Sequence, residues 1–306
     1  MAYRCPSCGE RAPALYVREY KAFPPVVLNA VGFRQHGKTV YFAALFYALK
    51  KLRLASHWDD FFTMSLDEDS LNTVYENMRL LEAGRLPNAT PRNFPRPTML
   101  RVYGVPFQPS YTLLCYDTGG ECFEKPNQLV QFAGFVRRAK AVLFLMSLGD
   151  MKDANAEAYR LLNTYLIGMG ELGGNTHNQH LIVVCTKADQ LVDKLPEDVV
   201  DYLIHGTVKG LIQHDNYMTT LYQMSTRLRT YIQNTVGAYE FLNAADAHFK
   251  SVNFSVISAL GAAPEGSRLP VEIVPRRVFD PLFWAMEKSR MTWKDRLYGL
   301  FRGRKT

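Results

Sequence analysis

The chain has 306 residues, of which 47% are hydrophobic and 21% charged, a composition typical of a globular protein with one elaborated α/β domain or two small ones. The formal net charge is +7, but residues 290–306 contain six basic side chains against one acidic side chain, which argues against a broad nucleic-acid-binding face. We find no run of 18 or more apolar residues and no signal-peptide pattern, so we expect a cytoplasmic protein without a specific nucleic-acid partner.

The N-terminal segment, residues 1–22, contains CPSCG, in which Cys5 and Cys8 have the spacing of one knuckle of a zinc ribbon. This is half a site, because no second C-x-x-C and no nearby histidine follow. Zn²⁺ binding, or dimerisation through the knuckle, is one interpretation, and a packed knuckle without metal is the other. The remaining cysteines are expected to be small core residues: Cys115, Cys122 and Cys185.

An apolar run from Val26 to Val31 predicts a buried parallel strand, which leads into GFRQHGKT, residues 32–39. This sequence fits G-x-x-x-x-G-K-[ST], the phosphate-binding loop. Its glycines let successive N–H groups point at a phosphate, Lys38 adds a point charge, and the Thr39 hydroxyl can ligate Mg²⁺. Residues 40–52 have a helical pattern, so phosphates would also lie at a helix N-terminus. The candidate nucleotide contacts in this segment are Gly32, Gln35, His36, Gly37, Lys38, Thr39 and Val40.

A long segment, about residues 54–97, precedes the next clear strand. Residues 61–66 are a candidate extra strand, and a helix is expected after Asp67 or Asp69, with its apolar spacing at Leu71, Val74, Met78 and Leu81. The proline-rich stretch that follows is expected to be a loop. The threonine that would meet a γ-phosphate and Mg²⁺ is either Thr90 in this loop or Thr98 at the start of the next strand. We favour Thr90, because irregular chain can fold over a nucleotide.

Residues 98–107 and 111–121 predict two strands joined by a short turn. The second runs into Asp117-Thr118-Gly119-Gly120, a D-x-x-G sequence. Downstream of a phosphate-binding loop, Asp117 would hold Mg²⁺ through water, and the Gly120 N–H would bond the γ-phosphate. The segment after Gly120 would then respond to the presence of that phosphate.

Continuous apolar runs at residues 141–148 and 180–185 predict two more buried strands. The second leads into Thr186, Lys187, Ala188 and Asp189. In this position the Asp189 carboxylate can accept two hydrogen bonds from guanine, while the Lys187 stem lies along the base and Thr186 braces the loop. A last strand, residues 252–257, leads into a turn whose backbone N–H could meet the guanine carbonyl; the turn residues are Ser258, Ala259 and Leu260.

Taken in this order, each at the end of a strand, GFRQHGKT, DTGG, TKAD and SAL resemble the motifs of the Ras-like, TRAFAC-class P-loop GTPases. The resemblance implies a three-layer α/β P-loop NTPase fold with a mainly parallel sheet, over residues 23–288, with helical insertions at about 54–97 and 196–250. It also implies GTP and GDP as ligands, with Mg²⁺ held by Thr39, Asp117 and Thr90. The cysteine knuckle, the long first insertion and PRRVFDPLFWAM resemble bacterial conflict-system GTPases, which implies a protein effector or activator encoded nearby.

Two departures from the Ras pattern concern hydrolysis. Arg34 and Gln35 stand where Ras itself has small residues, so they either crowd the site of an incoming arginine finger or let Arg34 contribute charge itself. Glu121 replaces the water-orienting glutamine, and a γ-phosphate would repel its carboxylate unless the carboxylate is paired. We therefore expect slow hydrolysis without a partner. The candidate catalytic residues are Lys38, Glu121, Arg34 and Thr90.

The tail, residues 289–306, places Trp293, Leu297, Leu300 and Phe301 at helical spacing among basic residues. Such a basic amphipathic helix suits an anionic membrane surface or an acidic groove, and the alternative is that it packs on the protein's own sheet. Taken together, the motifs predict a GTP-binding and GTP-hydrolysing switch that signals to a protein partner. The alternatives are a scaffold subunit that hardly hydrolyses GTP and a general P-loop ATPase.

Overall fold

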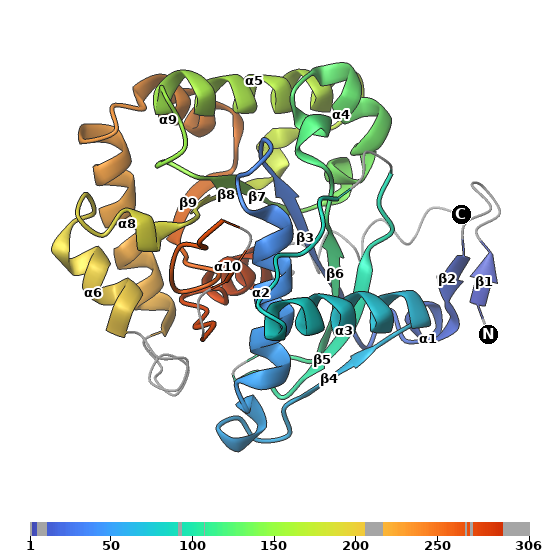
Figure 1. The fold of residues 1–306 in the computed structure, drawn as a ribbon. Helices are drawn as coiled ribbons and strands as arrows, with labels where there is room; N and C mark the ends of the chain where they lie inside the picture. Colours follow the sequence, from blue (N-terminus) through green and yellow to red (C-terminus); the bar gives the residue numbers. More distant parts are fainter. Residues whose placement is uncertain are drawn as a thin grey trace.

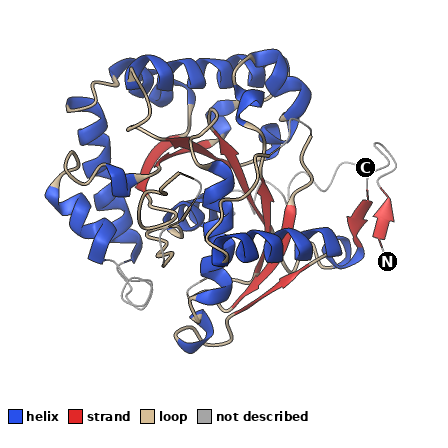
Figure 2. Cartoon of the chain, in the orientation of Figure 1, coloured by secondary structure: helices blue, strands red, loops and turns tan. Residues whose placement is uncertain are grey.

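A single seven-stranded sheet organises the chain, in the strand order β4-β5-β6-β3-β7-β8-β9 (Figures 1 and 2). The computed structural model describes residues 2–4, 11–90, 94–106, 108–205, 217–266, 268–269 and 272–289. Helices cover both faces of the sheet, which confirms the three-layer α/β architecture with a mainly parallel sheet that the motifs predict.

The strands divide into a parallel part and an antiparallel edge. The parallel strands are β3 (Pro25–Val31), β6 (Tyr111–Tyr116), β7 (Ala141–Met146), β8 (His180–Cys185) and β9 (Ser251–Val256). Strands β4 (Phe62–Ser65) and β5 (Thr98–Tyr103) run antiparallel at one edge. All seven correspond to predicted strands, although β4, β5, β6 and β7 are shorter than expected and β9 begins and ends one residue earlier. The parallel strands share one carboxyl edge, where their following loops meet.

Successive side chains along the buried strands point to opposite faces of the sheet, so they pack into two separate hydrophobic cores. Along β7, Leu143 and Leu145 belong to one core, while Val142 and Phe144 belong to the other. The first core is covered by α2 (Lys38–Lys51), α3 (Glu68–Glu82) and α10 (Asp280–Ser289). The second is covered by α4 (Pro126–Phe132), α5 (Ala154–Glu171), α6 (Glu197–His205) and α9 (Tyr239–His248), and α8 (Tyr217–Asn234) contributes its first turns to the first core and its last turns to the second. None of the helices in the described ranges is long and apolar enough to cross a lipid bilayer.

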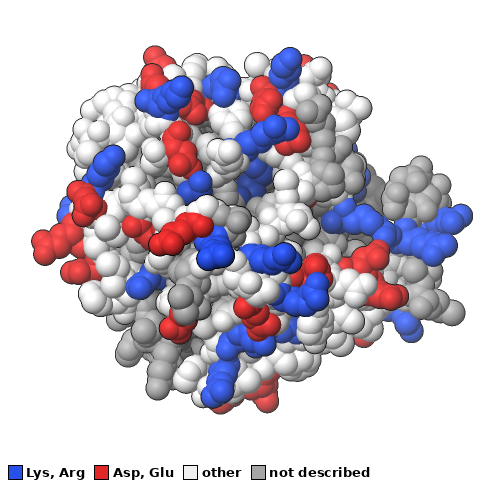
Figure 3. Space-filling view, viewed as in Figure 1, with Lys and Arg blue, Asp and Glu red and all other residues white. Residues whose placement is uncertain are grey.

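The remaining elements are short. Strands β1 (Ala2–Arg4) and β2 (Arg11–Pro13) form a separate antiparallel pair beside α1 (Ala14–Arg18), and the sequence patterns did not predict them (Figure 1). The single-turn 3₁₀ helices are η1 (Leu54–Ser56), η2 (Gly120–Phe123), η3 (Gly134–Arg138), η4 (Thr176–Asn178) and η5 (Ala188–Gln190). On the face drawn in Figure 3, acidic and basic side chains are interspersed.

Helix α3 confirms one prediction and corrects another. Asp67 caps it, because its carboxylate accepts a hydrogen bond from the Ser70 N–H at 2.8 Å. However, Leu71 is 42% exposed and does not belong to the buried stripe, which consists of Ser70, Val74, Met78 and Leu81. The helix turns its Ser70 side towards the sheet, where the Ser70 hydroxyl accepts a hydrogen bond from the Met99 N–H.

A buried polar network connects α10 to helices α6 and α8. Asp280, the first residue of α10, is 1% exposed, and its carboxylate accepts hydrogen bonds from the hydroxyls of Tyr202 (2.7 Å) and Tyr217 (2.5 Å). Arg277 stacks over the Tyr202 ring at 3.3 Å and donates to the Tyr202 carbonyl at 2.6 Å. Burial raises the pKa of Asp280, while the charge of Arg277 and the two hydroxyl donors oppose this rise. The two hydroxyls therefore stabilise the ionised carboxylate.

Replacement of Tyr217 by phenylalanine should lower the free energy of unfolding by about 1–3 kcal/mol, because a buried carboxylate oxygen loses its donor. Tyr222→Phe, in the same helix, is the matched control, since the Tyr222 hydroxyl pairs with Glu287 at 2.9 Å at an exposed position. We expect the control to cost about 0.5 kcal/mol or less. Denaturant unfolding of both variants measures the difference, and equal losses would contradict this role of Asp280.

Candidate functional site

The loops after β3, β6, β8 and β9 surround one cavity of about 590 Å³ at the carboxyl edge of the sheet. In parallel sheets this edge is where ligands bind. The cavity is lined from five segments: Arg34, Gln35, Gly37, Lys38, Thr39 and Val40; Leu86, Pro87, Asn88, Ala89 and Thr90; Thr118, Gly119, Gly120 and Glu121; Thr186, Lys187, Asp189 and Gln190; and Ile257, Ala259, Leu260, Ala262 and Pro264.

The loop between β3 and α2 has a left-handed backbone at two positions. Gly37, the residue before α2, has φ +82°, and Gln35 has φ +63°. Lys38 is only 6% exposed, and its ammonium group donates to the carbonyls of Gly32 (2.7 Å) and Phe33 (2.9 Å). Burial lowers the pKa of Lys38 to about 8, while the nearby Asp117 and Glu121 charges oppose this effect. The ammonium therefore lies at the centre of the loop.

His36 and Thr186 fix the loop against the sheet. The His36 Nδ1–H donates to the Leu145 carbonyl at 3.0 Å, and burial lowers the pKa of this imidazole. The Thr186 hydroxyl donates to the His36 carbonyl at 3.0 Å. The His36 side chain thus points away from the cavity and towards β7, so its side chain holds the loop in position.

Three oxygen-bearing side chains meet at the N-terminus of α2. The Thr39 and Thr90 hydroxyls lie 2.8 Å apart, and the Thr90 hydroxyl donates to Asp117 Oδ2 at 2.6 Å. Burial raises the pKa of Asp117, and the hydrogen bond from Thr90 opposes this rise. Thr98, the other candidate threonine, is the first residue of β5 and pairs with Cys115. The structure therefore brings Thr90, and not Thr98, to Thr39 and Asp117.

These residues fit Mg²⁺, which prefers hard oxygen ligands. Asp117 Oδ1 is buried and has no hydrogen-bond partner among the described residues, so an oxygen is left for a cation or its water. Within the described ranges, no group of three or more His, Cys, Asp or Glu side chains forms a metal site. A set of one carboxylate and two hydroxyls suits Mg²⁺ that also binds phosphate oxygens.

Asp189 lines the same cavity from the segment after β8. Its Oδ1 accepts a hydrogen bond from the Ser258 hydroxyl at 2.5 Å, and the Ser258 oxygen accepts one from the Gly261 N–H at 2.9 Å. Lys187 has φ +54°, and its ammonium donates to Asp150 Oδ2 at 2.6 Å. Asp150, which belongs to none of the sequence motifs, therefore fixes the end of the Lys187 side chain.

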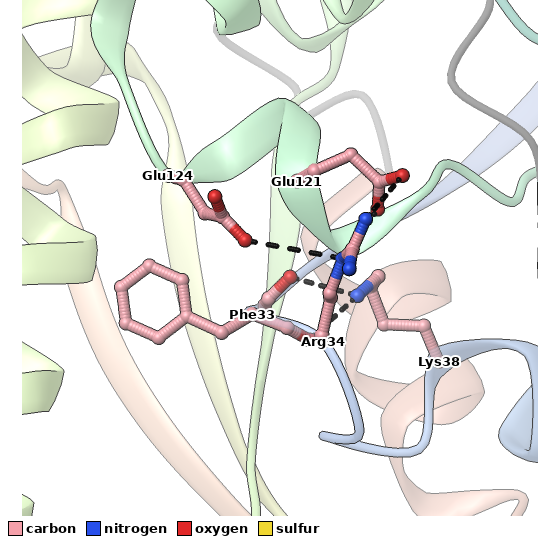
Figure 4. A network of polar contacts seen from close by, with 6 residues as sticks. Phe33, Arg34, Lys38, Glu121 and Glu124 are labelled. Carbon is pink, nitrogen blue, oxygen red and sulfur yellow. Dashed lines mark hydrogen bonds and ion pairs between the residues drawn. The ribbon is translucent and has the colours of Figure 1, made fainter.

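An ion pair links the phosphate-loop sequence to the segment after D-x-x-G (Figure 4). Arg34 donates from Nε to Glu121 Oε2 at 3.3 Å and from its terminal nitrogen to Glu121 Oε1 at 3.1 Å. The backbones also touch, since a Cβ on Gly120 would lie 2.3 Å from the Arg34 nitrogen. Only glycine allows this approach. Sequence reasoning named both charged residues but missed that they pair.

Replacement of Gly120 by alanine should lower the free energy of unfolding by about 1–3 kcal/mol and weaken ligand binding in the cavity at least about 10-fold. The added methyl group would force the Arg34 backbone away, and backbone cannot yield as a flexible side chain can. Gly170→Ala is the control, because a Cβ at that exposed helical position meets no atom within 4 Å. Thermal unfolding and a nucleotide titration measure both effects. Equal behaviour of the two variants would contradict the close contact.

Most other candidate residues lie on the cavity wall or directly behind it. Gly32 and Ser258 are not on the wall: Gly32 binds Lys38 through its carbonyl, and Ser258 binds Asp189. Cys115, Cys122 and Cys185 are buried in the cores, as expected. Cys5 and Cys8 lie outside the described residues, as do the tail positions Trp293, Leu297, Leu300 and Phe301.

The family described as Double-GTPase 2 has a model that matches residues 27–257. This range runs from β3 to the residue after β9 and contains the segments that line the cavity up to Ile257. No curated protein matches the chain by sequence.

Several solved structures are similar at low identity. The Ski7 GTPase-like domain of S. cerevisiae, bound to GDP and inorganic phosphate, is 15% identical, with 92% of this chain and 53% of that chain covered and a TM-score of 0.39. Toc33 of Arabidopsis thaliana is 12% identical, with 90% and 87% covered and a TM-score of 0.36. The SRb-GTP/SRX complex of Chaetomium thermophilum is 14% identical, with 88% and 99% covered and a TM-score of 0.37. The chain spans about half the length of the Ski7 chain.

Proposed function

The chain belongs to the Double-GTPase 2 family of P-loop GTPases, and on this basis we propose that it is a GTP-binding and GTP-hydrolysing switch that signals its nucleotide state to a protein partner. GTP binding and hydrolysis are the general properties that the family carries. What we propose in addition is that the protein acts as a switch and that it needs a protein partner.

The observation that carries the proposal is the continuity of the cavity. Lys38 and Thr39, from the end of the loop after β3, and Asp189, from the loop after β8, line a single space of about 590 Å³, and β7 separates these two strands in the sheet. Such a space suits a nucleoside triphosphate, with phosphates at the N-terminus of α2 and the base at Asp189. A carboxylate selects guanine over adenine, because guanine presents two adjacent donors, the ring N1–H and the exocyclic amine.

Mg²⁺ would supply positive charge to the phosphates, and we assign its binding to Thr39, Thr90 and Asp117. The 2.8 Å and 2.6 Å contacts among these three side chains support this assignment. Lys38 would bind the β- and γ-phosphates, and the Gly120 N–H would bond the γ-phosphate. Because Thr90 and Gly120 belong to different loops, loss of the γ-phosphate would release both loops together, and a partner would detect this change.

We also propose a cytoplasmic location and a protein effector or activator encoded nearby, in a bacterial conflict or defence system. The support for this partner is the sequence resemblance of the cysteine knuckle, the first insertion and PRRVFDPLFWAM to such GTPases. Binding of Zn²⁺ by Cys5 and Cys8, dimerisation, and contact of the basic tail with an anionic membrane surface remain proposals from sequence alone.

The test is to measure binding of fluorescent GTP, GDP and ATP, together with phosphate release, with Mg²⁺ and with EDTA. We expect selective binding of guanine nucleotides, Mg²⁺-dependent binding of GTP, and slow turnover that a partner accelerates. Equal affinity for ATP would instead support the general ATPase. Selective GTP binding without turnover under any condition would support the scaffold, for which Glu121 in place of a water-orienting glutamine is the favouring observation.

A further inference from the structure

Arg34 and Glu121 form a contact between the two segments that the proposed function places at the γ-phosphate. The guanidinium uses two nitrogens, at 3.3 Å and 3.1 Å, on the two oxygens of one carboxylate. A second carboxylate, Glu124, lies 4.0 Å from Arg34 Nε (Figure 4). Both Arg34 and Glu121 line the cavity that also contains Lys38.

The side chains of Arg34 and Glu121 differ in how freely they can move. The Arg34 side chain is 64% exposed, whereas the Glu121 side chain is 14% exposed. Glu121 also lies in a tightly packed turn, because a Cβ on Gly119 would come within 3.0 Å of both Glu121 Oε2 and the Thr90 carbonyl. An ion pair with one well-exposed partner is weak, so a more highly charged anion can compete with Glu121 and bind the Arg34 guanidinium in its place. Arg34 is therefore the side chain that can move.

We propose that this ion pair is a latch that the γ-phosphate of GTP opens. The γ-phosphate competes with Glu121 for Arg34, and the released guanidinium then stabilises the charge that develops during hydrolysis. Glu121 binds Arg34 as long as no γ-phosphate is present, and it does not act as the catalytic base. GDP lacks the competing phosphate, so the latch closes again after hydrolysis. This inference rests on the proposed function of the cavity.

The proposed step needs no co-reactant besides water. The water oxygen forms a bond to the γ-phosphorus, and the bond from that phosphorus to the bridging oxygen breaks. The bridging oxygen keeps the electron pair as part of GDP, and a water proton moves to a γ-phosphate oxygen, which gives dihydrogen phosphate. Arg34 contributes charge and hydrogen bonds and exchanges no proton, because its guanidinium stays charged at all relevant pH values.

The latch predicts opposite effects for its two partners. Arg34→Ala should lower kcat about 100-fold and lower the affinity for GTPγS relative to GDP about 10-fold. Glu121→Gln keeps the shape but removes the charge, so it should raise kcat about threefold or more and raise the affinity for GTPγS relative to GDP. Glu124→Gln should act in the same direction as Glu121→Gln but more weakly, since its contact with Arg34 is longer. The double variant Arg34→Ala/Glu121→Gln should behave as Arg34→Ala does.

Phosphate release under multiple turnover gives kcat, and titrations with fluorescent GTPγS and GDP give the affinities. Unchanged GDP affinity verifies that each variant folds, and Arg34→Lys, which should retain part of the activity, provides a second variant at the same position. A loss of kcat in Glu121→Gln as large as in Arg34→Ala would overturn the latch, because Glu121 would then act in catalysis. Wild-type activity in Arg34→Ala would overturn it as well. Wild-type protein that binds no guanine nucleotide would overturn both the latch and the proposed function.

Discussion

Replacement of Lys38 by alanine is expected to raise the Kd for GTP and GDP at least about 30-fold, the largest loss of nucleotide affinity that we expect from a single change at the phosphate end. The ammonium is buried and lies 2.7 Å and 2.9 Å from the Gly32 and Phe33 carbonyls, in the centre of the loop that would surround the phosphates. Loss of one partner from a buried charge pair costs about 2–5 kcal/mol, which corresponds to a factor of about 30 to several thousand in affinity.

The measurement is a titration with fluorescent nucleotide, accompanied by thermal unfolding in the absence of nucleotide. Lys51→Ala is the control, because Lys51 ends the same helix and forms an exposed ion pair with Glu82 at 2.7 Å. The control should bind nucleotide as the wild type does. If Lys38→Ala unfolds normally and still binds GTP with wild-type affinity, the loop between β3 and α2 does not bind phosphate.

The parallel strands were predictable from sequence because burial on both faces leaves a continuous apolar run. Residues 141–148 and 180–185 are such runs; the second forms a strand with these bounds, and the first forms a strand that ends two residues earlier, at Met146. The motifs at the ends of these strands then had to meet, since parallel strands share a carboxyl edge. This geometric rule, rather than the identity of any one residue, explains why distant motifs such as residues 32–39 and 186–189 line one cavity.

Contacts that depend on the exact approach of two loops were not predictable. Arg34 and Glu121 are 87 positions apart, and their pairing depends on how closely Gly120 packs against the Arg34 backbone. The network around Asp280 similarly joins three distant segments through the tyrosine hydroxyls. The apolar spacing of α3 includes Leu71, which is exposed, because a spacing pattern cannot distinguish neighbouring positions when the buried side of the helix is narrow; Ser70 takes the inward position.

The second large effect is expected for Asp189→Asn, which should change the base that the cavity prefers. An asparagine amide keeps the size of the side chain but replaces one carboxylate oxygen by an NH₂ donor. Guanine offers two donors to this position, so the variant should bind GTP at least about 100-fold more weakly, because charge-assisted hydrogen bonds of about 1.5–3 kcal/mol each are lost. Xanthine carries a carbonyl where guanine carries the amine, so the variant should bind XTP about as well as the wild type binds GTP.

The Ser258 hydroxyl determines which atom of the side chain faces the base, since its 2.5 Å hydrogen bond to Asp189 Oδ1 holds the side chain in one orientation. In Asp189→Asn the serine can still donate to the amide oxygen, so the remaining NH₂ group should face the base. Asp193→Asn, an exposed position in the next turn of chain, is the charge-matched control and should leave the preference for GTP unchanged. Competition of GTP, XTP and ATP against one fluorescent nucleotide measures all three affinities. If Asp189→Asn retains the wild-type order of affinities, Asp189 does not contact the base, and the guanine assignment of this end of the cavity is wrong.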